Sequence, residues 1–101
     1  MTSVGFYKEM KLYNNNGSIS ESIVESIDYN KEKVINYLNN HKVVGICARY
    51  AIDCITGEKI SSGFKILNDG EYEWPDFLAY HIMKYNLKIP EAFIEKIDAY
   101  S

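Results

Sequence analysis

The sequence predicts an α+β fold in which a small antiparallel sheet carries helices packed on one face. Short apolar runs separated by turn residues indicate strands and hairpins, chiefly over 43–74. Apolar residues at helical spacing indicate a helix at 30–39 and a C-terminal pair of helices, each started by a proline. The chain has 101 residues, which suits a single globular domain, 1–101, with one core.

The first third of the chain has the weakest pattern. Residues 4–13 mix apolar and charged residues in rough alternation, which predicts a strand. The Asn-Gly segment 14–17 is typical of a turn, because both residues tolerate left-handed backbone angles. Residues 18–29 leave two alternatives open. Ser18 and Glu21 fit a capping box and a short helix, whereas the many serines favour an ordered loop.

The middle of the chain predicts one helix followed by strands. Asn30 can cap a helix over 30–39, whose apolar face holds Val34, Ile35 and Leu38. The run 43–55 is apolar and rich in β-branched residues, which predicts a buried strand.

Two hairpin turns follow from the positions of glycine. The segment 53–59 contains Gly57 and predicts one turn, with a new strand beginning near Ile60. The Asp69-Gly70 step predicts a second turn, and residues 71–74 form its return strand.

The two prolines predict the starts of the last two helices. Pro75 suits the first turn of a helix because its missing N–H is not needed there, and Pro90 repeats the pattern. The expected buried stripes are Phe77, Leu78, His81, Ile82 and Tyr85 in the first helix, and Phe93, Ile94 and Ile97 in the second.

Charge and composition indicate which class of molecule the chain can bind. Fourteen acids against eleven bases give a net charge of −3, and Arg49 is the only arginine. We therefore expect no nucleic-acid partner, and a cationic protein is the better electrostatic match. No apolar run is long enough to span a membrane, and the first ten residues do not resemble a signal peptide. Two cysteines without an export signal indicate the reducing cytoplasm.

An acidic ladder surrounds the second hairpin. In a strand, side chains alternate between faces, so Asp69, Glu71 and Glu73 are expected on one face and Tyr72 and Trp74 on the other, packed on the following helix. Asp76 follows closely. Three interpretations of these acids stay open: a charged strand edge that prevents sheet-to-sheet association, a protein-binding patch, and a catalytic carboxylate pair.

The residues suited to metal binding or catalysis form no recognisable site. Cys47 and Cys54 are seven residues apart, unlike the spacing of a zinc knuckle, and both fall in an apolar region. His81 lies at helical spacing from its apolar neighbours and is expected to be a packing residue, while His41 follows a helix end. We predict no catalytic residue, no metal site and no cofactor.

The most specific part of the chain resembles a known family. The runs DGEYEWP at 69–75 and LAYHIMKYNLKIPEAF at 78–93 resemble the pattern DGxWxWPxxLAYYxxxYxxxLPxEF of small bacterial proteins. These are similar to immunity proteins encoded beside polymorphic or contact-dependent toxins. Weaker features extend the resemblance to 29–93, and Tyr72 and His81 depart from it where Trp and Tyr are common. The resemblance implies a cytosolic, non-enzymatic protein that binds and blocks a cognate toxin.

The sequence hypothesis is therefore an immunity-type protein that neutralises a bacterial toxin, a basic nuclease being one candidate. It acts as a monomer or a homodimer, and the expected contact residues are Asp69, Glu71, Glu73, Asp76, Tyr50 and Tyr100. Two alternatives stay open. One is a small enzyme or ligand-binding domain with a carboxylate or Cys–His site, and the other is a homodimeric structural or regulatory module with a tyrosine-rich surface.

Overall fold

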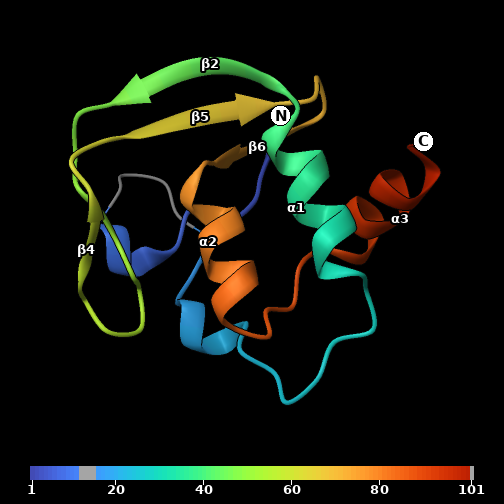
Figure 1. Cartoon of the computed structure of the whole chain (residues 1–101), viewed down its shortest axis with the longest axis horizontal. Coiled ribbons are helices and arrows are strands. Elements are labelled where there is room, and N and C mark those ends of the chain that lie inside the picture. Colours follow the sequence, from blue (N-terminus) through green and yellow to red (C-terminus); the bar gives the residue numbers. More distant parts are fainter. Residues whose placement is uncertain (12–15, 101) are drawn as a thin grey trace.

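The computed structural model describes residues 1–11 and 16–100 and has the predicted α+β class (Figure 1). Four strands form one sheet in the order β1-β6-β5-β2, and β3 pairs with β4 in a second, two-stranded sheet. The strands are Thr2–Ser3 (β1), Lys42–Cys47 (β2), Ala51–Ile52 (β3), Lys59–Ser61 (β4), Phe64–Asn68 (β5) and Tyr72–Pro75 (β6). The helices are Lys31–Asn39 (α1), Phe77–Lys84 (α2) and Glu91–Ala99 (α3), with 3₁₀ helices at Lys8–Met10 and Ile19–Glu21.

The four-stranded sheet is mixed, whereas the sequence predicts an antiparallel one. β1 runs parallel to β6, with Thr2 opposite Tyr72. The predicted strand over 4–13 is wrong within the described residues, because Lys8–Met10 is a 3₁₀ helix and 12–13 lie outside the described part. Gly5 explains the break: its φ of +83° is incompatible with a strand, and it turns the chain into the core.

The segment after residue 17 combines the two alternatives that the sequence left open. Ser18 caps the 3₁₀ helix Ile19–Glu21 in a capping box with Glu21, as its spacing predicts. Beyond that helix the chain is an extended loop held against the segment between α2 and α3. Val24 N–H donates to the Asn86 carbonyl at 2.9 Å, and Lys88 N–H donates to the Ser22 carbonyl at 2.7 Å. Of the predicted turn at 14–17, residues 14 and 15 lie outside the described part.

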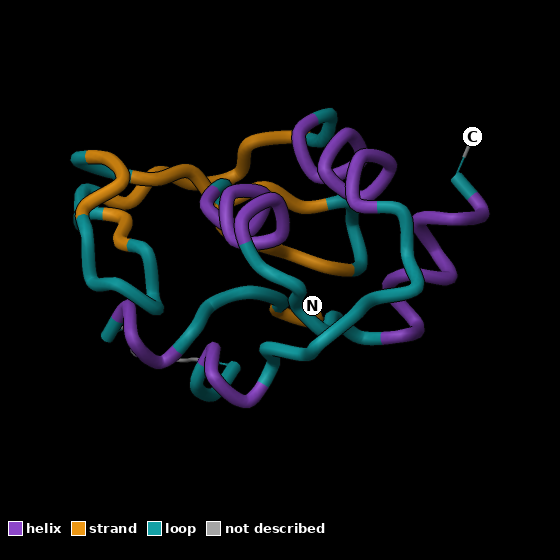
Figure 2. The backbone as a smooth tube through the Cα atoms, turned by 60° about the horizontal axis from the view of Figure 1, so that its bottom comes forward, coloured by secondary structure: helices purple, strands orange, loops and turns teal. Residues whose placement is uncertain are grey.

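Helix α1 forms where the sequence predicts it. The Asn30 side chain caps it by accepting a hydrogen bond of 3.0 Å from Lys33 N–H. Its buried face holds Val34, Tyr37 and Leu38 and packs against α2 and α3 (Figure 2).

The run 43–55 is not the single buried strand that its composition predicts. It divides into β2 and β3, and β2 lies at the edge of the sheet with a register shift between Val43 and Gly45. Only β5 pairs with β2 in this sheet. The apolar side chains of β2 reach solvent, and Ile46 is 80% exposed. The β-branched composition of the run therefore predicts the strand but not its burial.

Both predicted hairpins are confirmed. β3 and β4 pair in antiparallel across the 53–59 turn, where Gly57 has a φ of +78°. β5 and β6 pair in antiparallel across the Asp69-Gly70 turn, where Gly70 has a φ of +95°. Both glycines hold a left-handed conformation that L side chains rarely adopt.

Trp74 lies at the centre of the core. It is fully buried, its ring N–H donates to the Leu38 carbonyl at 3.2 Å, and its ring centroid lies 5.5 Å from that of Phe93. Tyr72 stacks on the same Phe93 ring at 4.5 Å. The predicted burial of these two aromatics is confirmed, although they pack on α1 and α3 and not mainly on the following helix, α2. Pro75 ends β6 just before α2, and Pro90 is the N-cap of α3.

Candidate functional site

Asp69 does not lie on the acidic contact face that the sequence predicts. Its side chain is 2% exposed and accepts hydrogen bonds from the N–H groups of Glu71 and Tyr72, at 2.8 and 2.7 Å, and from the Tyr37 hydroxyl at 2.6 Å. Lys96 Nζ lies 3.2 Å away. Burial alone would raise the pKa of the Asp69 carboxyl, but these hydrogen bonds outweigh it and lower that pKa to about 2. Asp69 therefore organises the β5–β6 turn and is not a surface contact.

The other three hairpin acids do not share one exposed face. Glu71 is exposed and forms an ion pair with Lys96 at 2.9 Å. Glu73 is half-buried within β6, and Asp76 accepts a hydrogen bond of 3.1 Å from Lys65 N–H. The edge-protection alternative is also wrong, because β6 lies between β1 and β5 in the sheet and is not an edge strand.

The two tyrosines predicted to contact a partner are exposed but far from each other. Tyr50 lies between β2 and β3 and is 59% exposed, with Lys59 Nζ 4.3 Å from its ring centroid. Tyr100 follows α3 and is 56% exposed, with its ring edge against Tyr37. These segments lie on opposite sides of the molecule (Figure 1), so the structure does not combine them into one surface.

Cys54 and His81, one pair that could form the Cys–His site of the enzyme alternative, are held together by a structural hydrogen bond. His81 Nε2 accepts from the Cys54 N–H at 3.0 Å, and His81 Nδ1 therefore carries the proton donated to the Phe77 carbonyl at 2.9 Å. Both side chains are buried. Burial lowers the pKa of His81, and it raises the pKa of the Cys54 thiol to about 12. His81 is thus the packing residue that its spacing predicts.

Asp53 is the centre of a second buried network. It is fully buried and accepts hydrogen bonds from Tyr80 Oη at 2.8 Å, Tyr85 Oη at 2.8 Å and the Ile55 N–H at 2.9 Å. Lys84 Nζ forms an ion pair with it at 3.0 Å. Burial alone would raise the pKa of Asp53, but these donors together hold it well below its usual range. The network joins the β3–β4 hairpin to α2. The buried Asp53 carboxylate therefore has a structural role.

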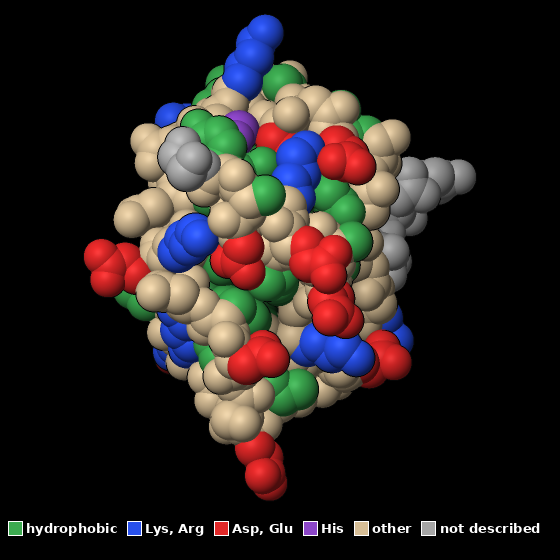
Figure 3. All heavy atoms as spheres, turned by 90° about the vertical axis from the view of Figure 1, so that its right-hand side faces the viewer, with side chains coloured by type: hydrophobic (Ala, Val, Ile, Leu, Met, Phe, Trp, Pro, Cys, Tyr) green, Lys and Arg blue, Asp and Glu red, His purple; other side chains and the backbone are tan. Residues whose placement is uncertain are grey.

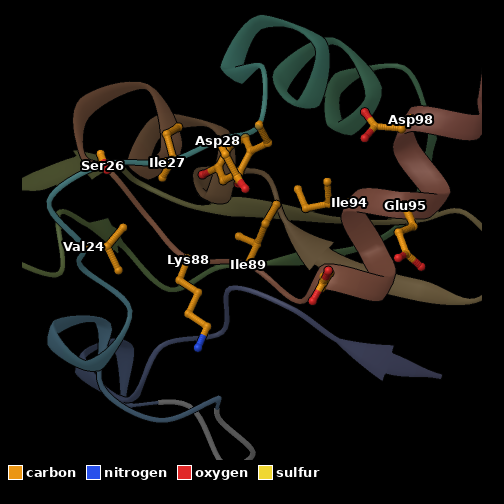
Figure 4. Close-up of a pocket in the computed structure, with 11 residues that line it drawn as sticks. Val24, Ser26, Ile27, Asp28, Lys88, Ile89, Ile94, Glu95 and Asp98 are labelled. Atoms are coloured by element: carbon orange, nitrogen blue, oxygen red, sulfur yellow. The ribbon is translucent and has the colours of Figure 1, made fainter.

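A hollow lies on the surface between the loop 24–29 and α3, and we call it the α3 groove (Figure 4). It has a volume of about 470 Å³. Its apolar residues are Val24, Ile27, Ile89 and Ile94, together with the ring of Tyr29. The hydroxyl of Tyr29 donates to the Leu87 carbonyl, which fixes the loop against the segment that precedes α3. The groove is therefore built by segments that are about 60 residues apart in the sequence.

Acidic side chains border this groove. Asp28, Glu91, Glu95 and Asp98 line it, and Lys88 is the one cation among the lining residues. Asp98 lies 3.5 Å from Lys33 Nζ, whereas Asp28, Glu91 and Glu95 form no ion pair within the described ranges. Figure 3 shows red acidic side chains beside green apolar ones on this side of the molecule. The groove therefore combines an apolar floor with a net negative rim.

A second hollow of about 420 Å³ continues the groove toward the N-terminal segment. It is lined by residues of 3–7 and 21–22, and it shares Lys88, Ile89 and Glu91 with the α3 groove. The shared residues show that the two hollows are adjacent.

The sequence prediction missed this groove, although part of its signal was present. Glu91, Glu95 and Asp98 are spaced by four and three residues, so they lie on one face of a helix. Asp28 and Ile27 could not have been assigned to the same site, because no sequence feature indicates that their loop packs beside α3.

Comparisons with protein-family models, with curated proteins and with solved structures found no match to this chain. Over residues 1–11 and 16–100, no helix has the length and apolar character needed to cross a membrane. The same residues contain no group of three or more His, Cys, Asp or Glu side chains placed to hold a metal ion.

Proposed function

We propose that this chain is a non-enzymatic, cytoplasmic protein of the immunity type, which binds and neutralises a cognate bacterial toxin. A basic nuclease is the toxin class that best matches its charge. The observation that carries the proposal is the α3 groove, where an apolar floor lies beside Asp28, Glu91 and Glu95, three carboxylates that form no ion pair with any described residue. Such a surface is typical of recognition of a cationic protein.

The hydrogen bonds made by the buried polar side chains support a binding function over a catalytic one. Asp53, Asp69 and His81 have lowered pKa values, and shifted pKa values are a common mark of active sites. Each of these side chains is engaged in hydrogen bonds that join elements of the fold. None of the three lines the α3 groove or the hollow beside it, where a substrate would have room.

Charge would also speed the encounter with a basic toxin. The net charge of −3 includes the acids of the groove, which lie on one side of the molecule. A field of this kind raises association rates, and added salt weakens it. We therefore expect the association rate to fall as ionic strength rises, with a smaller change in the dissociation rate.

The proposal is tested by co-expressing the chain with a toxin encoded beside its gene. We expect cells that make the toxin alone to die and cells that make both proteins to grow. We also expect the chain to co-purify with a catalytically inactive form of the toxin at low salt. A toxin that stays fully active and forms no complex at low salt would contradict the proposal for that pair.

A further inference from the structure

We infer that the α3 groove receives an extended segment of the partner protein in which a single lysine or arginine is flanked by apolar residues. This inference rests on the proposed function and specifies the partner's contact. It moves the expected interface from the β5–β6 hairpin to the groove between the loop 24–29 and α3.

The shape and chemistry of the groove match the two parts of such a side chain. The alkyl stem of a lysine or arginine can lie on Ile27, Ile89 and Ile94, which form the apolar floor. Its cationic end can then reach the carboxylates of Glu91 and Glu95, which line the groove from α3. Burial of the stem and pairing of the charge favour the same placement.

The unpaired state of the acids distinguishes this site from the hairpin. At the hairpin, Asp69 and Glu71 are already neutralised by Lys96. In the groove, Asp28, Glu91 and Glu95 form no ion pair with any described residue. A cationic side chain from a partner would therefore meet carboxylates without displacing an internal lysine.

Lys88 and the apolar floor indicate that the partner segment carries one cationic side chain and not several in a row. Lys88 lies where the groove meets the neighbouring hollow and would repel a second positive charge there. The apolar residues between the acids and Lys88 instead favour aliphatic neighbours on the partner segment. The adjacent hollow, which shares Lys88 and Ile89 with the groove, offers such a segment further room.

The test uses three capped peptides and NMR shift titration of the full chain. The probe is acetyl-Gly-Ile-Arg-Ile-Gly-amide. In one control peptide citrulline, the uncharged analogue, replaces the arginine, and in the other glycine replaces both isoleucines. We expect the probe to shift amides of 24–29 and 88–98 at peptide concentrations up to about 5 mM, and each control to bind about three- to tenfold more weakly.

Matched variants test the same contact from the protein side. Glu91→Gln with Glu95→Gln should weaken probe binding about three- to tenfold. Glu32→Gln with Glu58→Gln removes the same charge from exposed positions outside the groove and should leave binding within about twofold. Spectra of each variant without peptide report whether its fold is intact. The peptide controls with the unaltered chain do not depend on the variants folding.

The inference is overturned if the probe does not bind, if the citrulline peptide binds equally well, or if the shifts fall outside the groove. It is also overturned if a second copy of the chain, and not the peptide, occupies the groove, which concentration-dependent shifts without peptide would show. Neutralisation of the toxin together with failure of the peptide would leave the proposed function standing and remove only the groove. Peptide binding without neutralisation would contradict the proposed function, and would leave only the preference of the groove for a cation flanked by apolar residues.

Discussion

The ring Nε2 of His81 accepts a hydrogen bond of 3.0 Å from the backbone N–H of Cys54. The contact joins α2 to the turn after β3, and Asp53 beside it binds Tyr80, Lys84 and Tyr85 of the same helical segment. The buried side chains of His81 and Asp53 therefore join α2 to the β3–β4 hairpin. We therefore expect substitutions of these side chains to change the stability of the fold and not the rate of a reaction.

His81 makes stability depend on pH. Burial lowers its pKa below the value of about 6.5 expected in the unfolded chain. Below that pH the unfolded chain binds a proton that the folded chain does not, so stability is complete above about pH 6.5 and falls as pH drops toward 5. We expect this one group to contribute at most about 1.4 kcal/mol per pH unit, measured by urea unfolding.

The matched variant for this prediction is His81→Gln. It should be less stable than the unaltered chain at pH 7.5, because a buried ring and two hydrogen bonds are lost, but its stability should change less between pH 7 and pH 5. Parallel pH profiles for the two proteins would show that His81 is not the group responsible.

Replacement of Asp53 should cost more stability than loss of any one of its donors. Asp53→Ala leaves two tyrosine hydroxyls and the Lys84 ammonium without their acceptor, and we expect a loss of about 3–5 kcal/mol in the free energy of unfolding. Tyr85→Phe removes the hydroxyl that donates to the carboxylate and should cost less than Asp53→Ala, because the other donors remain. Tyr50→Phe, at an exposed ring, is the control and should be close to neutral. Equal losses for all three would contradict the network.

Two glycines allow backbone strain to be separated from steric conflict. A Cβ added at Gly5 would lie 2.8 Å from Leu78 Cδ1, and φ there is +83°. Gly57 has a similar φ of +78°, but nothing lies within 4 Å of an added Cβ. We expect Gly57→Ala to cost about 1–2 kcal/mol from backbone strain alone, and Gly5→Ala about 1–3 kcal/mol more. Chemical denaturation of both variants measures the difference, and equal costs would show that Leu78 yields without penalty.

The exposed edge strand β2 should promote self-association at high concentration. Its backbone groups on the outer side lack a partner strand in the sheet described here, and Ile46 is 80% exposed. We expect Ile46→Lys to lower the weight-average mass measured by light scattering at high concentration, with stability unchanged within about 0.5 kcal/mol. Met83→Lys, at an exposed position of α2, is the control. A mass that falls equally with both variants would point to general repulsion and not to the strand edge.

Elements specified by neighbouring residues were predictable from the sequence. Asn30 caps α1, and the Asp69-Gly70 step turns β5 into β6, because both signals act within a few residues. Thr2 carries no comparable signal, since its strand is defined by a partner 70 residues away. Strand alternation predicts the wrong position for Asp69, because Asp69 belongs to the turn. Its carboxylate binds the backbone of its own hairpin instead. The α3 groove, like strand β1, is not predictable from local residues, because it depends on two distant segments that lie side by side.

The parallel pairing of β1 with β6 has a consequence for synthesis of the chain. Ser3 cannot take its place until Glu73 has been made, and Trp74 has no complete environment until Phe93 is present in α3. Contacts this distant in sequence close slowly, because the chain between them must be ordered first. Residues 2–3 therefore stay unpaired until residues 72–73 have been translated, and the core can form only when α3 has emerged from the ribosome.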